Sequence, residues 1–306
     1  MSDGSVILTG FLAATVRIST PLLLAATGEM VNERAGVINL GVEGAMLAGA
    51  LASAIGAVAG GPWAGVAAAL GAGMLLAGIF GAMAIGARTD QIVTGAAVTL
   101  GAVGLTGAIY RSAFGTSGPG LSIPTFATWP VPGLREIPLL GPALFEQSAL
   151  TYLGWILIPI AGWFLFRSWW GLALRATGES AEAARAVGIP VRRVQILATL
   201  AGGALSGLAG ATLVLAQVGT FAEKMTAGRG FIAIAIVVLG RWRPAGVLVA
   251  ALLFGAASAL QFALQAMGLA APYQLFLVLP YAIALLALAG GVGRARAPAG
   301  LGKPAA

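Results

Sequence analysis

The chain has 306 residues, of which 59% are hydrophobic and only 9% are charged, whereas soluble domains carry roughly 25% charged residues. So few charges cannot cover a water-facing surface, and apolar stretches recur from residue 6 to residue 292, so a soluble protein is excluded. The lack of cysteine and histidine excludes thiol chemistry, imidazole catalysis and the common zinc sites. The net charge of +7 comes from basic residues scattered between apolar stretches, which indicates membrane topology and not a nucleic-acid site.

The apolar stretches are continuous and do not alternate between apolar and polar residues. In a membrane only helices and closed β-barrels satisfy every backbone polar group, and continuous apolar stretches are typical of helices. We therefore predict an all-α, polytopic transmembrane helical bundle that forms a single domain over residues 1–306. Residues 1–4 lack the basic start of a cleavable signal peptide, so the first stretch is kept as a span. No pair of carboxylates is expected at helical spacing within one apolar segment, so no metal site is predicted.

At ~20 residues per span, the uncharged windows predict about nine spans. In chain order they are 6–26, 44–59, 63–86, 92–110, 150–166, 194–218, 231–240, 245–265 and 273–292. The segment 231–240 is too short to cross as a straight helix. It is either a re-entrant piece or a helix continued by backbone that is buried in protein.

The distribution of basic residues predicts the orientation, because Arg and Lys accumulate on the cytoplasmic side of a membrane. A cytoplasmic C-terminal tail, 293–306, places twelve basic residues inside and four outside, with Arg17 within the first span. The loop 111–147 is then external. Its many prolines predict an ordered cap over the helix ends or an external docking surface.

The cytoplasmic loop 167–193 contains the signals of a short helix near 181–187. Ser180 is a suitable N-cap, Glu182 lies in the first turn, Gly188 can adopt the left-handed conformation after the last turn, and Pro190 prevents continuation. Such a short helix is marginal alone in water, so a stable one needs a partner. It is either an interfacial connector or a coupling helix that sits in a groove of a soluble cytoplasmic subunit. One face carries Ala183, Ala184 and Val187.

Glycines interrupt the apolar sequence before the second span and bring polar residues with them. Irregular backbone at membrane depth is tolerated only where it is buried or lines a cavity, and a carboxylate there often has a role in a pathway. We predict that Asn39, Gly41, Glu43 and Gly44 lie on or near a translocation route.

An alternative for Glu43 is that it caps the next helix and pairs with Arg34 or Arg17. The small residues Gly203, Gly207 and Ala211 form one face of a later span. This face predicts close helix packing in preference to substrate contact.

Several of these motifs resemble one family. Glu182, Ala183 and Ala184, with Gly188 after them, resemble the EAA-type loop of ABC-importer permeases, which contacts the ATPase subunit. The segment 28–49 reads GEMVNERAGVINLGVEGAMLAG and resembles the signature of permeases for simple sugars and nucleosides, in the wider group of ribose and branched-chain amino acid permeases. The resemblance continues through GLALRATG at 171–178, the glycines of 202–210, GRGFIA at 228–233 and RWRP at 241–244. It covers nearly the whole chain, and the chain length resembles that of the shorter of two related nucleoside-system permeases.

The resemblance implies a multi-pass permease subunit of a bacterial inner membrane that carries a nucleoside or simple sugar. Its implied partners are cytoplasmic ATP-binding subunits, a second related permease or a second copy of itself, an extracytoplasmic substrate-binding protein, and membrane lipid. The chain has no Gly-x-x-x-x-Gly-Lys-Ser/Thr loop, so ATP is expected on the partner, with no cofactor on this chain and no enzyme activity of its own. The coupling residues would be Glu182, Ala183, Ala184, Val187 and Gly188.

Two other classes remain as alternatives. An ion-coupled secondary carrier would need buried ionisable groups, for which Arg17 and Glu43 are the obvious candidates. A membrane-embedded enzyme is disfavoured by the lack of histidine, cysteine and a buried Asp pair.

Overall fold

The computed structural model describes residues 3–115, 123–266 and 297–303, together with the single positions 278, 282 and 286. Long helices dominate it. They are α1 (Asp3–Arg34), α2 (Val42–Gly60), α3 (Pro62–Gly81), α4 (Gln91–Phe114), α6 (Ala149–Arg167), α9 (Val191–Thr212) and α11 (Pro244–Ala266). Two π-helical turns, Ala82–Gly86 and Leu213–Val218, continue α3 and α9. The shorter elements are β1 (Thr128–Pro130), a 3-10 turn at Leu134–Glu136, α5 (Leu140–Leu144), β2 (Glu146–Ser148), α7 (Trp169–Glu179), α8 (Ala181–Ala186) and α10 (Arg229–Leu239).

Seven helices in the described part of the chain are long and apolar enough to cross a membrane. They correspond to seven of the expected spans, which confirms a polytopic helical membrane protein. The expected segment 231–240 forms α10, an apolar helix of only 11 residues. The expected span 273–292 lies outside the described residues, apart from its three single positions.

α1 continues to Arg34, beyond the expected end of the first span at residue 26. Glu29 and Glu33 therefore lie four residues apart on one helix, and both are buried. The expectation that no carboxylates are paired at helical spacing was wrong, because the apolar window ends before the helix does. In the part of the chain that the structure describes, no group of three or more potential metal ligands accompanies this pair.

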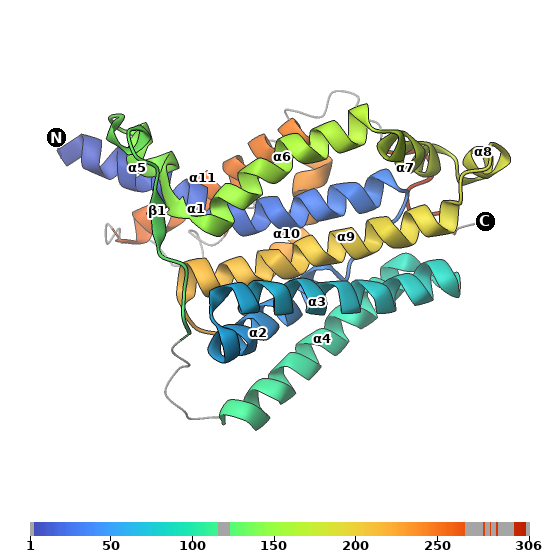
Figure 1. The fold of residues 1–306 in the computed structure, drawn as a ribbon, viewed down its shortest axis with the longest axis horizontal. Coiled ribbons are helices and arrows are strands. Elements are labelled where there is room, and N and C mark those ends of the chain that lie inside the picture. Colours follow the sequence, from blue (N-terminus) through green and yellow to red (C-terminus); the bar gives the residue numbers. More distant parts are fainter. Residues whose placement is uncertain are drawn as a thin grey trace.

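α9 lies at the centre of the bundle, between α1 and α3 (Figure 1). Its glycines allow this: a Cβ on Gly203 or Gly207 would overlap with α3, and a Cβ on Gly210 would overlap with the Met46 carbonyl of α2. Small residues let helix backbones approach closely where lipid supplies little driving force. The predicted packing role of this face is thus confirmed.

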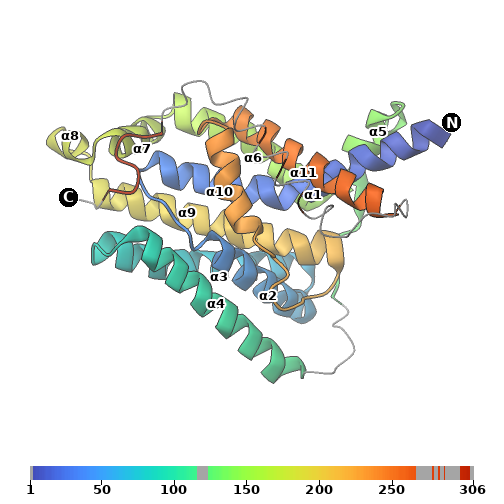
Figure 2. The ribbon, with the colours of Figure 1, turned by 180° about the vertical axis from the view of Figure 1, so that it is seen from behind.

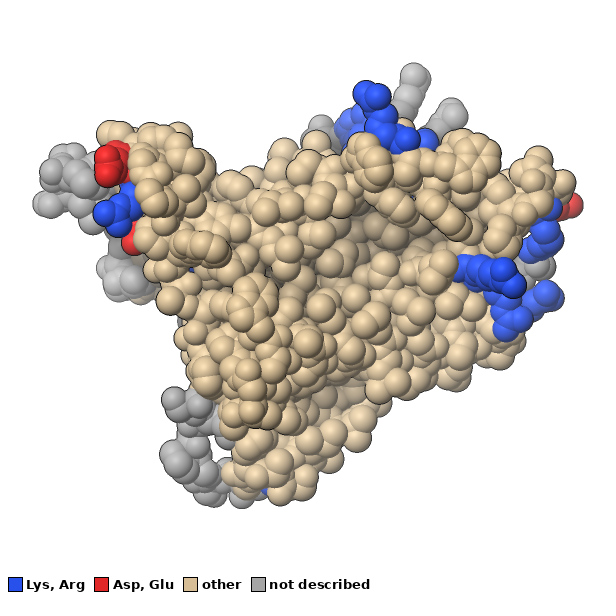
Figure 3. All heavy atoms as spheres, viewed as in Figure 1, with Lys and Arg blue, Asp and Glu red and all other residues tan. Residues whose placement is uncertain are grey.

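The two ends of the bundle differ. At one end, near the N-terminus, β1 and β2 form an antiparallel pair and α5 packs beside α1. At the other end lie α7, α8 and the described C-terminal residues, as the opposite views show (Figures 1 and 2). On the face drawn in Figure 3, Lys and Arg side chains gather toward the α8 end and at the upper edge, the β1–β2 end carries both signs, and most of the surface between them is uncharged. An uncharged middle with charged ends is what a membrane-spanning bundle requires.

Candidate functional site

The irregular segment 35–41 connects α1 to α2 and carries Asn39. The Asn39 backbone N–H donates to Glu29 Oε1 at 2.8 Å, and the Gly41 N–H donates to Asn39 Oδ1 at 2.9 Å. The second Glu29 oxygen accepts from Asn32 Nδ2 at 2.8 Å. A fully buried α1 carboxylate therefore holds the segment in place, and sequence reasoning did not single out Glu29.

Glu43 lies in the first turn of α2 and is buried. Its carboxylate accepts from Thr226 Oγ1 at 2.6 Å, from the Gly228 N–H at 2.8 Å and from the Gly230 N–H at 2.6 Å. These donors lie at the beginning of α10, where backbone N–H groups have no partner within the helix and favour negative charge. Glu43 thus stabilises the N-terminus of α10, because its carboxylate accepts hydrogen bonds from backbone N–H groups there that have no partner within the helix.

The alternative role of Glu43 as a helix cap agrees with the structure, but the helix and the partner residues that it named were wrong. Glu43 caps α10 and not its own helix, and it pairs with neither Arg34 nor Arg17. The Arg34 Nε donates to the Trp242 carbonyl at 2.9 Å. The carbonyl of Arg17 accepts from Gln217 Nε2 at 2.6 Å, at a distant position on α1.

The predicted glycines mark two close approaches. A Cβ on Gly44 would lie 2.9 Å from the Cα of Thr99 on α4, and one on Gly41 would lie 2.7 Å from Asn39 Oδ1. Thr99 Oγ1 also donates to the Leu40 carbonyl at 3.0 Å. The four residues predicted for the route therefore lie together, where α1, α2, α4 and α10 meet.

A second carboxylate that sequence reasoning missed, Glu33, binds the corner between α10 and α11. It accepts a hydrogen bond from the indole Nε1–H of Trp242, a buried residue. Arg241 and Trp242 both have positive φ angles, of 55° and 52°, which are unfavourable for bulky residues. A helical reading of segment 28–34 would have placed Glu29 and Glu33 on one face.

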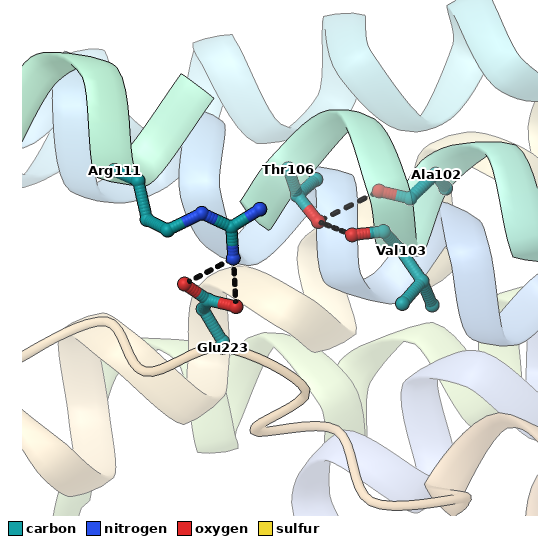
Figure 4. A network of polar contacts seen from close by, with 5 residues as sticks. All are labelled: Ala102, Val103, Thr106, Arg111 and Glu223. Atoms are coloured by element: carbon teal, nitrogen blue, oxygen red, sulfur yellow. Dashed lines mark hydrogen bonds and ion pairs between the residues drawn. The ribbon is translucent and has the colours of Figure 1, made fainter. Parts of the chain in front are cut away.

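The segment that leads into α10 is also held from α4. Arg111 and Glu223 form an ion pair at 2.7 Å (Figure 4), and the Tyr110 and Phe221 rings lie 5.1 Å apart. The ion pair is partly exposed, so its contribution is about 0–1 kcal/mol. It helps to hold the segment that contains Thr226 and Gly228, which donate hydrogen bonds to Glu43.

α8 corresponds to the helix expected near 181–187. Ser180 Oγ accepts from the Ala183 N–H at 3.2 Å, and Gly188 has a φ of 84°, as expected for the residues that cap its two ends. Of the expected coupling residues, Glu182, Ala183, Val187 and Gly188 are exposed, with Val187 at 77%. Ala184 is only 3% exposed and packs inward, so it anchors the helix instead of facing outward.

The family profile of the permease component of branched-chain amino acid transport systems matches residues 11–288. A putative glucose ABC transporter permease protein of Haloferax volcanii is 42% identical over 266 residues, which cover 85% of this chain and 79% of the relative. A guanosine ABC transporter permease protein of Bacillus subtilis is 36% identical over 310 residues, with 97% of each chain covered.

A nucleoside ABC transporter permease protein of Lactococcus lactis is 32% identical over 292 residues, which cover 92% of this chain and 91% of the relative. No solved structure matches the chain. The family profile extends over most of the chain and all three relatives cover more than two thirds of it. The chain therefore belongs to the family of branched-chain amino acid transport system permease components.

Proposed function

We propose that this protein is the membrane-spanning permease subunit of an ATP-driven ABC importer for a nucleoside or a simple sugar. The observation that carries the proposal is an exposed short helix, α8, at the basic end of a chain that belongs to a permease family. The relatives named for guanosine, nucleoside and glucose transport support the substrate class. Nucleosides and sugars share hydroxyl groups, which amides and carboxylates recognise by hydrogen bonds.

α8 is the proposed docking element for the ATP-binding subunits. Its basic surroundings favour a cytoplasmic position for this end, with the C-terminal tail inside. Ala183 and Val187 offer a small apolar surface that a groove on the partner would cover, and Glu182 and Gly188 lie beside it. The partner binds and hydrolyses ATP, and this chain needs no cofactor of its own.

The proposed route passes the place where Asn39 and Glu43 lie. Both side chains are enclosed in this conformation, with exposures of 2% and 6%. Movement of α10 away from α2 would break the three hydrogen bonds to Glu43 and uncover polar groups for solute hydroxyls. Gly41 and Gly44 keep α2 close to α4, whereas Gly230 of α10 packs on the Glu43 backbone, and this second contact is the one that the movement would open.

The remaining proposed partners lie at other surfaces. An extracytoplasmic substrate-binding protein would dock at the β1–β2 end, opposite α8. A second related permease, or a second copy of this chain, would complete the membrane part of the transporter.

Affinity purification of the tagged chain in mild detergent tests the docking. We expect an ATPase subunit with a Walker motif to co-purify with the wild-type chain and to be lost from the double variant Ala183→Arg, Val187→Glu. Both changes are on exposed positions, so the fold is expected to remain intact. The matched control is Ala127→Arg, Leu134→Glu, which places the same residues at exposed positions of the opposite end.

The control is expected to retain the ATPase subunit. Retention of that subunit by the α8 variant would contradict docking through α8. A wild-type chain that purifies alone and transports without ATP would favour the secondary carrier instead.

A further inference from the structure

The C-terminal residues 297–303 lie between α7 and the segment 35–41, and Figure 2 shows this part of the chain beside α7. The Gly300 N–H donates to the Gly178 carbonyl near the end of α7 at 2.8 Å. The Gly302 N–H donates to the Gly36 carbonyl at 3.2 Å. Two residues of this C-terminal segment thus bind two regions that are more than 100 positions apart in sequence.

Gln91, the first residue of α4, completes the connection. Its Oε1 accepts from the Ile38 N–H at 2.8 Å, and its Nε2 donates to the Lys303 carbonyl at 3.3 Å. The Gln91 side chain is buried, and its two hydrogen bonds are partly buried. The C-terminal segment is therefore attached to segment 35–41 both directly and through Gln91.

The packing around these hydrogen bonds leaves no room for side chains. A Cβ on Gly300 would lie 2.8 Å from the Gly178 carbonyl oxygen, and one on Gly36 would lie 3.3 Å from the Gly178 Cα. A Cβ on Gly178 would overlap with the Arg34 carbonyl. The end of α1, the end of α7 and the C-terminal segment thus form one closely packed junction.

This junction adjoins both proposed functional regions. Ser180, which caps α8, is two residues after Gly178, and the Ala299 N–H donates to the intervening Glu179 carboxylate at 3.3 Å. On the other side, Gly36 and Ile38 directly precede Asn39, whose backbone Glu29 holds. A displacement of α8 would therefore reach segment 35–41 by two paths, directly where Gly178 packs against Gly36 and also through the C-terminal segment.

We propose that residues 297–303 form a positioning segment that transmits the movement of α8 to segment 35–41 during transport. The inference rests on the proposed function, because it assumes that an ATPase subunit moves α8. Closely packed backbones joined by several hydrogen bonds move as a unit, so the segment acts as a rigid connection. Without it, ATP hydrolysis would continue while the route residues no longer follow.

The test uses the whole transporter, with its partner subunits, reconstituted in liposomes. Uptake is measured with a mixture of tritiated guanosine and radiolabelled glucose, and ATP hydrolysis is measured in the same vesicles. A chain truncated after residue 296 is compared with one truncated after residue 303, which keeps the positioning segment. The first truncation removes four hydrogen bonds, those that join the segment to Gly36, Gly178, Glu179 and Gln91. We expect it to lower the number of solute molecules carried per ATP about tenfold. The second truncation is expected to keep the wild-type ratio.

A point variant tests the same segment without truncation, in case the truncated chain misfolds. Gly300→Val would push the segment away from Gly178, whereas the control Ala299→Val changes an exposed neighbour. A purely structural defect would lower hydrolysis and uptake together and leave their ratio unchanged. An unchanged ratio in a transporter that works would overturn the inference, whereas a wild-type transporter without ATP-dependent uptake would overturn the proposed function.

Discussion

At the scale of single residues, the buried carboxylates determine how the site is held. Glu43 accepts three hydrogen bonds with its two oxygens. A carboxylate suits this place because both of its oxygens act as acceptors and neither is a donor. Its partners come from a chain segment more than 180 positions away. Glu43 therefore joins the N-terminal and C-terminal halves of the bundle.

Replacing Glu43 by Gln tests this role. The amide group would turn a donor toward one of the backbone or hydroxyl donors, so we expect a loss of about 1–3 kcal/mol in the free energy of unfolding. Thermal unfolding in detergent would show a lower midpoint. The matched control is Glu146→Gln at an exposed position, where no change is expected. An equally stable Glu43→Gln protein with unchanged uptake would contradict both the capping and the route.

The sequence singled out Asn39 and Glu43 but not their partners, and their place on a route stays a prediction. Gly41 and Gly44 interrupt an apolar region, so polar neighbours such as Asn39 and Glu43 could be recognised as unusual. That Glu43 caps α10 depends on how two distant segments pack, which no local pattern reveals. The role of Glu29 was not predicted, because the expected span ends at residue 26 whereas α1 continues to Arg34.

At the scale of elements, the glycine face of α9 decides how closely the helices pack. Gly210 lies against the Met46 carbonyl of α2, with no space for a side chain. The long spans could be predicted, because about 20 apolar residues identify a crossing. α7 could not, because Ser168 caps it within a loop in which only α8 had been expected.

We predict that Gly210→Ala destabilises the protein by about 1–3 kcal/mol or more, as overpacking of a tight contact does. The comparison is Gly104→Ala on α4, where the added Cβ would meet open space. There the change should be neutral or slightly stabilising, because alanine is the better helix former by about 1 kcal/mol. Unfolding midpoints of the two purified variants give the measurement. Equal midpoints would show that close packing at Gly210 does not limit stability.

At the scale of the whole molecule, the two ends define how the protein lies in the membrane. Basic residues gather toward the α8 end, and the β1–β2 end is mixed in charge (Figure 3). The polytopic helical architecture could be predicted, because 9% charged residues indicate a protein surrounded by lipid and the continuous apolar stretches indicate helices. The contacts of residues 297–303 with α7 and α4 did not follow, because these residues have no periodic pattern to interpret.

Single cysteines test the orientation, because the chain has none of its own. An impermeant maleimide should label Leu134→Cys in intact cells, and it should label Ala183→Cys only after the membrane is opened. Both positions are exposed, so reactivity depends on the side of the membrane. The unmodified chain serves as the control. Labelling of Ala183→Cys in intact cells would place α8 outside and remove the proposed docking.

The central claim is that this chain forms the membrane path of an ATP-driven importer for a nucleoside or sugar. The most direct measurement is uptake of tritiated guanosine and radiolabelled glucose by vesicles that contain the chain and its co-purified subunits. One set of vesicles has ATP on the α8 side, and the other has only proton and sodium gradients. The claim predicts uptake with ATP that stops with a non-hydrolysable analogue and is absent with gradients alone. Uptake driven by a gradient, in the absence of ATP and of any ATPase subunit, would contradict it.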